Sequence, residues 1–171
     1  MRLAPLMIFA LCVAVFAVVL FRKDTPSLEL IDRPLPAFTL TALGGENASL
    51  STQELSEGTV LLNVFASWCV SCVAEHPVLM KAQRALGVPI YGLAWKDSPA
   101  DTYTWLAEHG NPYTQIGVDR EGRAAMELGV TGAPETFLIH HGHVRYRYPG
   151  PLMDEDIEET LPQLLRKLEE E

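Results

Sequence analysis

The hydrophobic pattern divides the chain into a short apolar segment and a longer part of mixed character. Leu3–Phe21 is a run of nineteen residues without a charge, apolar on every face of a helix. At about 1.5 Å of rise per residue, such a helix comes close to the roughly 30 Å of a bilayer's hydrocarbon core. No small-residue cleavage site follows Phe21. The pattern therefore predicts an uncleaved single-pass transmembrane helix in an anchor of residues 1–24, with a cleaved signal peptide as the alternative.

After residue 24 the apolar positions alternate between the spacing of strands and that of helices. Nearly continuous apolar runs predict buried strands at Thr59–Ala66 and Ile90–Trp95. Helical spacing predicts a helix between them, over Ser71–Leu86. The other predicted elements are a strand at Ala37–Leu40, a helix from Ser98 to His109, a strand at Thr114–Val118, a helix at Arg123–Leu128, a hairpin of Thr136–Ile139 with Val144–Tyr148, and a last helix from about Asp154. This order implies an α/β domain over residues 25–171, with a mixed central sheet and helices on both faces.

Composition and charge exclude some classes of function. The chain carries 13 Lys and Arg against 22 Asp and Glu, which gives a net charge of -9. Because proteins bind nucleic acid through clustered cations that meet its phosphates, this balance predicts no nucleic-acid partner. Three cysteines are too few for a small domain that is held together by disulfides.

Two of the cysteines, Cys69 and Cys72, lie between a predicted strand and a predicted helix. Their spacing suits either half of a zinc site or a redox pair, and His76 would supply only a third zinc ligand. At a helix N-terminus, free N–H groups and the helix dipole stabilise a Cys69 thiolate, the attacking species in disulfide exchange. Cys72, about one turn inward, can then resolve the mixed disulfide. This placement favours a redox pair, and it predicts no metal and no cofactor beyond a Cys69–Cys72 disulfide.

The chain resembles the thioredoxin fold through Trp68-Cys69-x-x-Cys72 and, about 60 residues later, Gly132-Ala133-Pro134-Glu135-Thr136. More narrowly, it resembles the membrane-tethered thiol:disulfide interchange proteins of cytochrome c maturation (the CcmG/DsbE type). The strings that carry this narrower resemblance are LLNVFASWCVSCVAEHP, YGLAWKD, GNPY and GVTGAPETFLI, followed by RYRYPG. Together they cover nearly everything from about Leu30 to the last helix.

The resemblance implies roles for residues around the cysteines. Pro134 falls where thioredoxin-like folds keep a cis proline, which would expose the backbone of Ala133 for pairing with a client strand. Trp68 is expected to act as a lid beside the cysteines.

The resemblance also bears on the direction of electron flow. Asn63 stands where many thioredoxins carry a buried, proton-accepting aspartate, and an amide cannot take up a proton at neutral pH. Glu75 and Glu135 are carboxylates that could face the same pocket, and the alternative for each is a solvated surface glutamate. Val70-Ser71 supplies no cation to stabilise a thiolate, and nearby anions would destabilise it further. We therefore expect the pair to donate electrons rather than accept them.

The resemblance finally implies partners and a location. The expected client is an apocytochrome c or a haem-maturation chaperone, and the expected electron donor is a membrane thiol reductant. The domain would face the periplasm, tethered to a bacterial inner membrane through residues 3–21. The alternatives are a general periplasmic thioredoxin-like reductase for other clients, and a non-catalytic module that binds a client or a metal through its cysteines. A thiol peroxidase is disfavoured because the Pro-x-x-x-Thr-x-x-Cys pattern is absent before Cys69.

Overall fold

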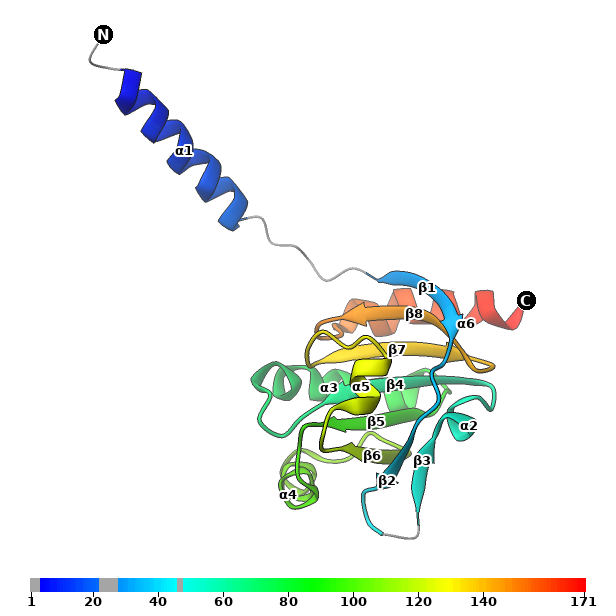
Figure 1. The fold of residues 1–171 in the computed structure, drawn as a ribbon. Helices are drawn as coiled ribbons and strands as arrows, with labels where there is room; N and C mark the ends of the chain where they lie inside the picture. The colour runs from blue at the N-terminus through cyan, green and yellow to red at the C-terminus, as the bar shows by residue number, and fades with distance from the viewer. Residues whose placement is uncertain (1–3, 22–27, 46–47) are drawn as a thin grey trace.

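The computed structural model describes residues 4–21, 28–45 and 48–171, and its strands form one eight-stranded sheet (Figure 1). The strands are β1 (Glu29–Pro34), β2 (Thr39–Ala42), β3 (Ser49–Ser51), β4 (Thr59–Phe65), β5 (Ile90–Trp95), β6 (Gln115–Asp119), β7 (Glu135–His140) and β8 (His143–Pro149). The helices are α1 (Ala4–Phe21), α2 (Thr52–Leu55), α3 (Val70–Ala85), α4 (Pro99–His109), α5 (Arg123–Glu127) and α6 (Leu161–Glu169), the last preceded by a π-helical turn, η1 (Asp156–Thr160).

The sheet is mixed, in the order β1-β8-β7-β4-β5-β6-β2-β3. Its centre is parallel, because β4 pairs with β5 and β5 with β6 in the same direction. The pairs β4–β7, β7–β8, β1–β8, β2–β6 and β2–β3 are antiparallel. The predicted α/β class with a mixed sheet is therefore confirmed.

Helices cover both faces of the sheet, and β4 contributes to the core on each face. Leu61 and Phe65 pack in one core with residues of α3, α4 and α6, whereas Leu62 and Val64 pack in the other with residues of α2 and α5. This alternation follows from the two-residue period of a strand. Asn63 therefore lies between Leu61 and Phe65 on the face that α3 covers, and it is fully buried.

Three short elements were not predicted from the sequence, namely β1, β3 and α2. β1 has an irregular register against β8, and Asp32 within it has a φ of 46°. β3 and α2 contain only three and four residues, too few to show a hydrophobic period. β2 lies two residues later than the predicted strand at 37–40.

The predicted N-terminal helix is present as α1. Among the described residues, no helix combines the length and the apolarity that crossing a membrane requires. The assignment of α1 as a transmembrane helix therefore stays a prediction. The predicted boundary between residues 24 and 25 lies outside the described residues.

Candidate active site

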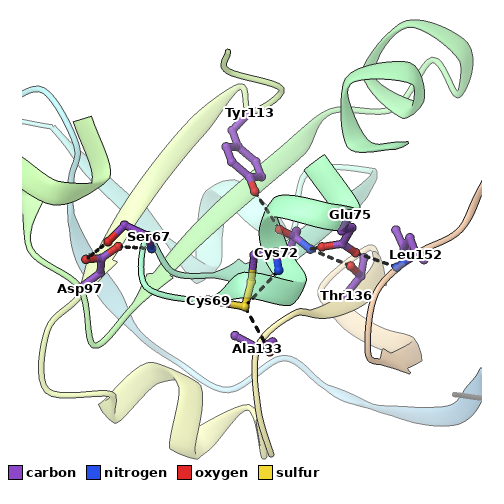
Figure 2. The surroundings of a disulfide bond; sticks show 10 residues. Ser67, Cys69, Cys72, Glu75, Asp97, Tyr113, Ala133, Thr136 and Leu152 are labelled. Atoms are coloured by element: carbon purple, nitrogen blue, oxygen red, sulfur yellow. Dashed lines mark hydrogen bonds between the residues drawn. A yellow bond between two sulfur atoms is a disulfide. The ribbon is translucent and has the colours of Figure 1, made fainter. Parts of the chain in front are cut away.

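Cys69 and Cys72 form a disulfide at the N-terminus of α3, as Figure 2 shows. Their Cα atoms are 5.3 Å apart, and only 5% and 2% of the two residues is exposed. The backbone N–H of Cys72 donates to Cys69 Sγ at 3.2 Å. In the reduced protein, this N–H and the first turn of α3 favour a thiolate on Cys69. The geometry therefore suits Cys69 as the attacking thiol.

The cis-proline loop borders the disulfide on its accessible side. The Ala133–Pro134 peptide bond is cis, and Cys69 Sγ lies 3.4 Å from the carbonyl oxygen of Ala133. A groove of about 230 Å³ runs along this loop, lined by Ser71, Thr131, Gly132, Ala133, Pro134, Glu135, Gly150 and Pro151. A polypeptide in this groove would lie next to the attacking sulfur.

Trp68 lies at the surface beside the disulfide and is 56% exposed. Its indole N–H donates to the carbonyl oxygen of Lys96 at 3.2 Å, and its ring centroid is 5.9 Å from that of Trp95. These contacts hold the ring against Lys96 and Trp95. Its role as a lid stays a prediction.

Asn63 is the centre of a buried hydrogen-bond network behind the disulfide. Its Nδ2 donates to Glu75 Oε2 at 3.2 Å and to Thr136 Oγ1 at 3.0 Å, and its Oδ1 accepts from the Tyr113 hydroxyl at 2.8 Å. Thr136 lies opposite Asn63 across the β4–β7 pair, so the sheet register brings these two together. Sequence analysis included Tyr113 only within the string GNPY and assigned it no role, because it lies 50 residues from Asn63 along the chain.

Glu75 is buried, with 1% of its surface exposed, one helical turn after Cys72 on the same helix. Its Oε1 accepts from the backbone N–H of Leu152 at 2.8 Å, and its Oε2 from Asn63. Within the described part of the chain, no cation forms an ion pair with it. Burial raises the pKa of Glu75 to about 7, and the negative charge of Asp156 adds to this, while its two hydrogen bonds oppose it. The alternative of a solvated surface glutamate is therefore wrong for Glu75.

Glu135 is equally buried, but its charge is compensated. Its Oε1 forms an ion pair with Arg147 Nε, and its Oε2 accepts from the backbone N–H groups of Thr131 at 2.9 Å and Gly132 at 3.4 Å. Arg147 also donates to the Thr131 hydroxyl at 2.8 Å. Glu135 thus supports the cis-proline loop. The alternative of a solvated surface glutamate is therefore wrong for Glu135, which lines the groove beside the cysteines with its charge paired to Arg147.

Asp97 fixes the turn that precedes the cysteines (Figure 2), a role that sequence analysis did not assign although Asp97 ends the string YGLAWKD. Its carboxylate accepts from the backbone N–H of Ser67 at 2.7 Å and from the Ser67 hydroxyl at 2.8 Å. It also accepts from the backbone N–H of Ser98 at 2.9 Å. The helix start at Ser98-Pro99 was the available signal, because an aspartate at such a start often accepts from backbone N–H groups.

Comparison with known proteins extends the similarity far beyond the cysteine motif. The model of the family described as Redoxin matches residues 31–164. The chain is 39% identical over 177 residues to the thiol:disulfide interchange protein DsbE of Haemophilus influenzae, which covers 99% of this chain and 97% of that protein. It is also 39% identical over 177 residues to the DsbE of Escherichia coli K12, covering 99% and 95%. A secreted thiol-disulfide isomerase from Corynebacterium glutamicum shares the fold, with a TM-score of 0.71 at 18% identity over 84% of this chain and 95% of that one.

Proposed function

We propose that this chain, which belongs to the Redoxin family and to its DsbE-type thiol:disulfide interchange proteins, supplies electrons for cytochrome c maturation outside the cytoplasm. Its class of activity is protein-disulfide oxidoreduction. The observation that carries the proposal is the Cys69–Cys72 disulfide at the start of α3, with the buried carboxyl group of Glu75 one turn further along the same helix.

In the first step, the Cys69 thiolate attacks one sulfur of a client disulfide. A Cys69–client disulfide forms, and the other client sulfur leaves as a thiolate. The client backbone would lie in the groove beside Ala133, whose carbonyl oxygen is 3.4 Å from Cys69 Sγ. An extended client segment could pair with this exposed backbone as an added strand.

In the second step, Cys72 gives its thiol proton to the carboxylate of Glu75 and attacks Cys69 Sγ. The Cys69–Cys72 disulfide forms, and the second client sulfur leaves as a thiolate. Two electrons have then passed from the cysteine pair to the client, and the proton on Glu75 returns to solvent or to a client thiolate. A proton acceptor is most effective when its pKa lies near the working pH, and burial raises the pKa of Glu75 to about 7.

The surroundings of Cys69 support the reducing direction. In the described structure, no Lys, Arg or His side chain hydrogen-bonds to either sulfur. Among the described residues, the stabilising group is the N-terminus of α3 with its Cys72 N–H, so the thiolate should be less stabilised than in a strong oxidant. Of the two glutamates, Glu75 is the one whose negative charge can act against the thiolate, because Arg147 compensates Glu135. We expect a reduction potential well below the roughly -120 mV of a strong oxidant.

The client and the location rest on the family resemblance. Haem attachment needs free cysteine thiols, so an apocytochrome c or the chaperone that holds it is the proposed client. The nineteen uncharged residues at positions 3–21 support a single-pass anchor in the inner membrane, with the domain in the periplasm. A membrane thiol reductant would return the Cys69–Cys72 pair to its reduced form.

The test is to trap the client in cells that make c-type cytochromes. A Cys72→Ala variant keeps the attacking thiol but cannot resolve the mixed disulfide, so it should accumulate an adduct with apocytochrome c or a haem-maturation chaperone. Cys69→Ala is the matched control and should form no adduct. Adducts spread over unrelated exported proteins would instead support the general reductase. Adducts that form only in Cys69→Ala would reverse the roles of the two cysteines.

A further inference from the structure

Tyr113 reaches the redox site from a loop on the far side of β5. Its ring is stacked on Phe65, with ring centroids 4.7 Å apart and planes at 20°, and its hydroxyl donates to Asn63 Oδ1 at 2.8 Å. Gly92 is the β5 partner of Asn63, and a Cβ there would lie 3.1 Å from Tyr113 Cγ and 2.9 Å from the Phe65 ring. The missing side chain at Gly92 therefore leaves the space through which Tyr113 approaches Asn63.

The hydroxyl of Tyr113 decides which way the Asn63 amide faces. With Oδ1 toward Tyr113, the two N–H bonds of Nδ2 point to Glu75 and Thr136. If the amide turned by half a rotation, the Tyr113 proton would lose its only hydrogen-bond acceptor in the described structure. A buried donor without an acceptor has lost its hydrogen bond to water and gained none in return, so the turned amide is disfavoured. Burial also raises the pKa of Tyr113 well above its ordinary value, so it remains a donor.

We propose that Tyr113 is a positioning residue of the redox site, which holds the N–H groups of Asn63 toward Glu75 so that Glu75 can carry negative charge. An ionised carboxylate needs donors around it, whereas a turned amide would present Oδ1 and repel the charge. The effect falls on the step in which Glu75 takes the thiol proton of Cys72. This inference rests on disulfide exchange at the cysteine pair and is independent of the identity of the client.

Among the groups around Glu75, the side-chain amide of Asn63 is the main contact that a substitution can change. Asp156 of η1 is negative and opposes the ionisation of Glu75. Tyr148 of β8 is neutral, because burial and then the charge of Asp156 raise its pKa to about 12. Cys72 lies one turn earlier on the same helix, and Leu152 donates a backbone N–H that no side-chain change removes. Among the described side chains, Asn63 is therefore the sole hydrogen-bond donor to Glu75.

The test uses Tyr113→Phe in the reduced full-length protein, with 5,5′-dithiobis(2-nitrobenzoate) as the disulfide probe. The first thionitrobenzoate is released when Cys69 attacks the probe, and the second when Cys72 resolves the mixed disulfide. We expect Tyr113→Phe to slow the second release about threefold to ninefold at pH 6, which lies about one unit below the Glu75 pKa of about 7, because its pH profile should shift upward by about half a unit to one unit. At pH 9 the second release should approach the wild-type rate. The first release should stay within about twofold of wild type at both pH values, since the proposed effect is on Cys72.

Two further variants separate positioning from a loss of structure. Tyr91→Phe removes a hydroxyl on the opposite face of β5 and should leave both pH profiles unchanged. In an Asn63→Ala background, where no amide remains to orient, Tyr113→Phe should have no additional effect on the second release. The proposal is overturned if Tyr113→Phe leaves the profile in place, slows both releases equally at every pH, or keeps its full effect in the Asn63→Ala background.

Discussion

Two glutamates approach the disulfide from different elements, equally buried but with different partners. Glu135 at the start of β7 meets a cation and two backbone N–H groups. Glu75 on α3 meets one amide side chain and one backbone N–H, and no described cation pairs with it. Both are 1% exposed, so burial alone does not separate their roles. Their ion-pair and hydrogen-bond partners separate the two roles. A carboxylate compensated by a cation supports structure, whereas an uncompensated carboxylate can exchange a proton.

The arrangement of the sheet explains why only one of the two glutamates forms an ion pair with a described cation. Glu135 lies opposite Pro149 in the β7–β8 pair, and Arg147 is two residues from that partner on the same face. Glu75 faces the part of the sheet formed by Asn63 and Thr136, which carry no charge. The charge of Asp156, which acts on Glu75, has the same sign.

The largest effect should come from removing the cation on the Glu135 side. Arg147→Met leaves a buried carboxylate without its partner, and we expect it to lower the free energy of unfolding by about 3 kcal/mol or more. Urea unfolding at pH 7 measures this. Arg145→Met is the matched control, because in the described part of the chain Arg145 pairs with the exposed Asp32 and Glu171, and it should cost less than about 1 kcal/mol. Equal losses in the two variants would remove the contrast between the glutamates.

The next effect concerns the pH dependence of stability on the Glu75 side. The pKa of Glu75 is about 7 in the folded protein against 4.5 ordinarily, so the folded state holds this proton more tightly than the unfolded state. Its contribution is therefore fully present below about pH 4.5 and is lost as the pH rises through about 7. Glu75→Gln should remove this loss, which amounts to at most about 3 kcal/mol. Denaturant midpoints of the oxidised protein, determined at about ten pH values between pH 4 and 8, would measure the change.

If the stability of Glu75→Gln still falls with rising pH as steeply as that of the wild type, a group other than Glu75 is responsible for the pH dependence. Glu127→Gln, at an exposed position on α5, is the control and should leave the pH dependence unchanged.

The smallest effect concerns the thiol itself. The carboxylate of Glu75 acts against a thiolate on Cys69, so Glu75→Gln should lower the pKa of Cys69 by about one unit or less. Titration of thiolate absorbance in the reduced protein measures this shift. A rise in the Cys69 pKa would mean that Glu75 stabilises the thiolate, which is opposite to the sign expected from its charge.

The sequence predicted well those elements whose burial is continuous. The strand at Ile90–Trp95 has its predicted bounds, and α3 begins one residue before the predicted Ser71. Both elements pack into the core, so the spacing of their apolar residues predicts their type and extent. β3 and α2 have no such signal, because elements of three or four residues are too short for a period to appear.

The candidate site likewise contains residues that the sequence predicted and residues whose partners it could not predict. The cysteines and Pro134 were identifiable because local motifs contain them. The two glutamates were also named as candidates for the pocket, but their partners were not predictable, because Arg147 and Leu152 reach them only through the sheet register and the last loop. Tyr113 likewise contacts Asn63 only because β5 carries Gly92 beside that asparagine.

The most direct measurement is the titration of Glu75 itself. Carbon-13 NMR of side-chain carboxyl groups in the oxidised full-length protein would follow its ionisation, with Glu75→Gln identifying the resonance. We expect a midpoint of about 7, since burial without a compensating cation holds the proton on this carboxyl group. A midpoint at the ordinary value of 4.5 would show that Glu75 is already ionised well below neutral pH, and it would contradict its role as the group that takes the proton from Cys72.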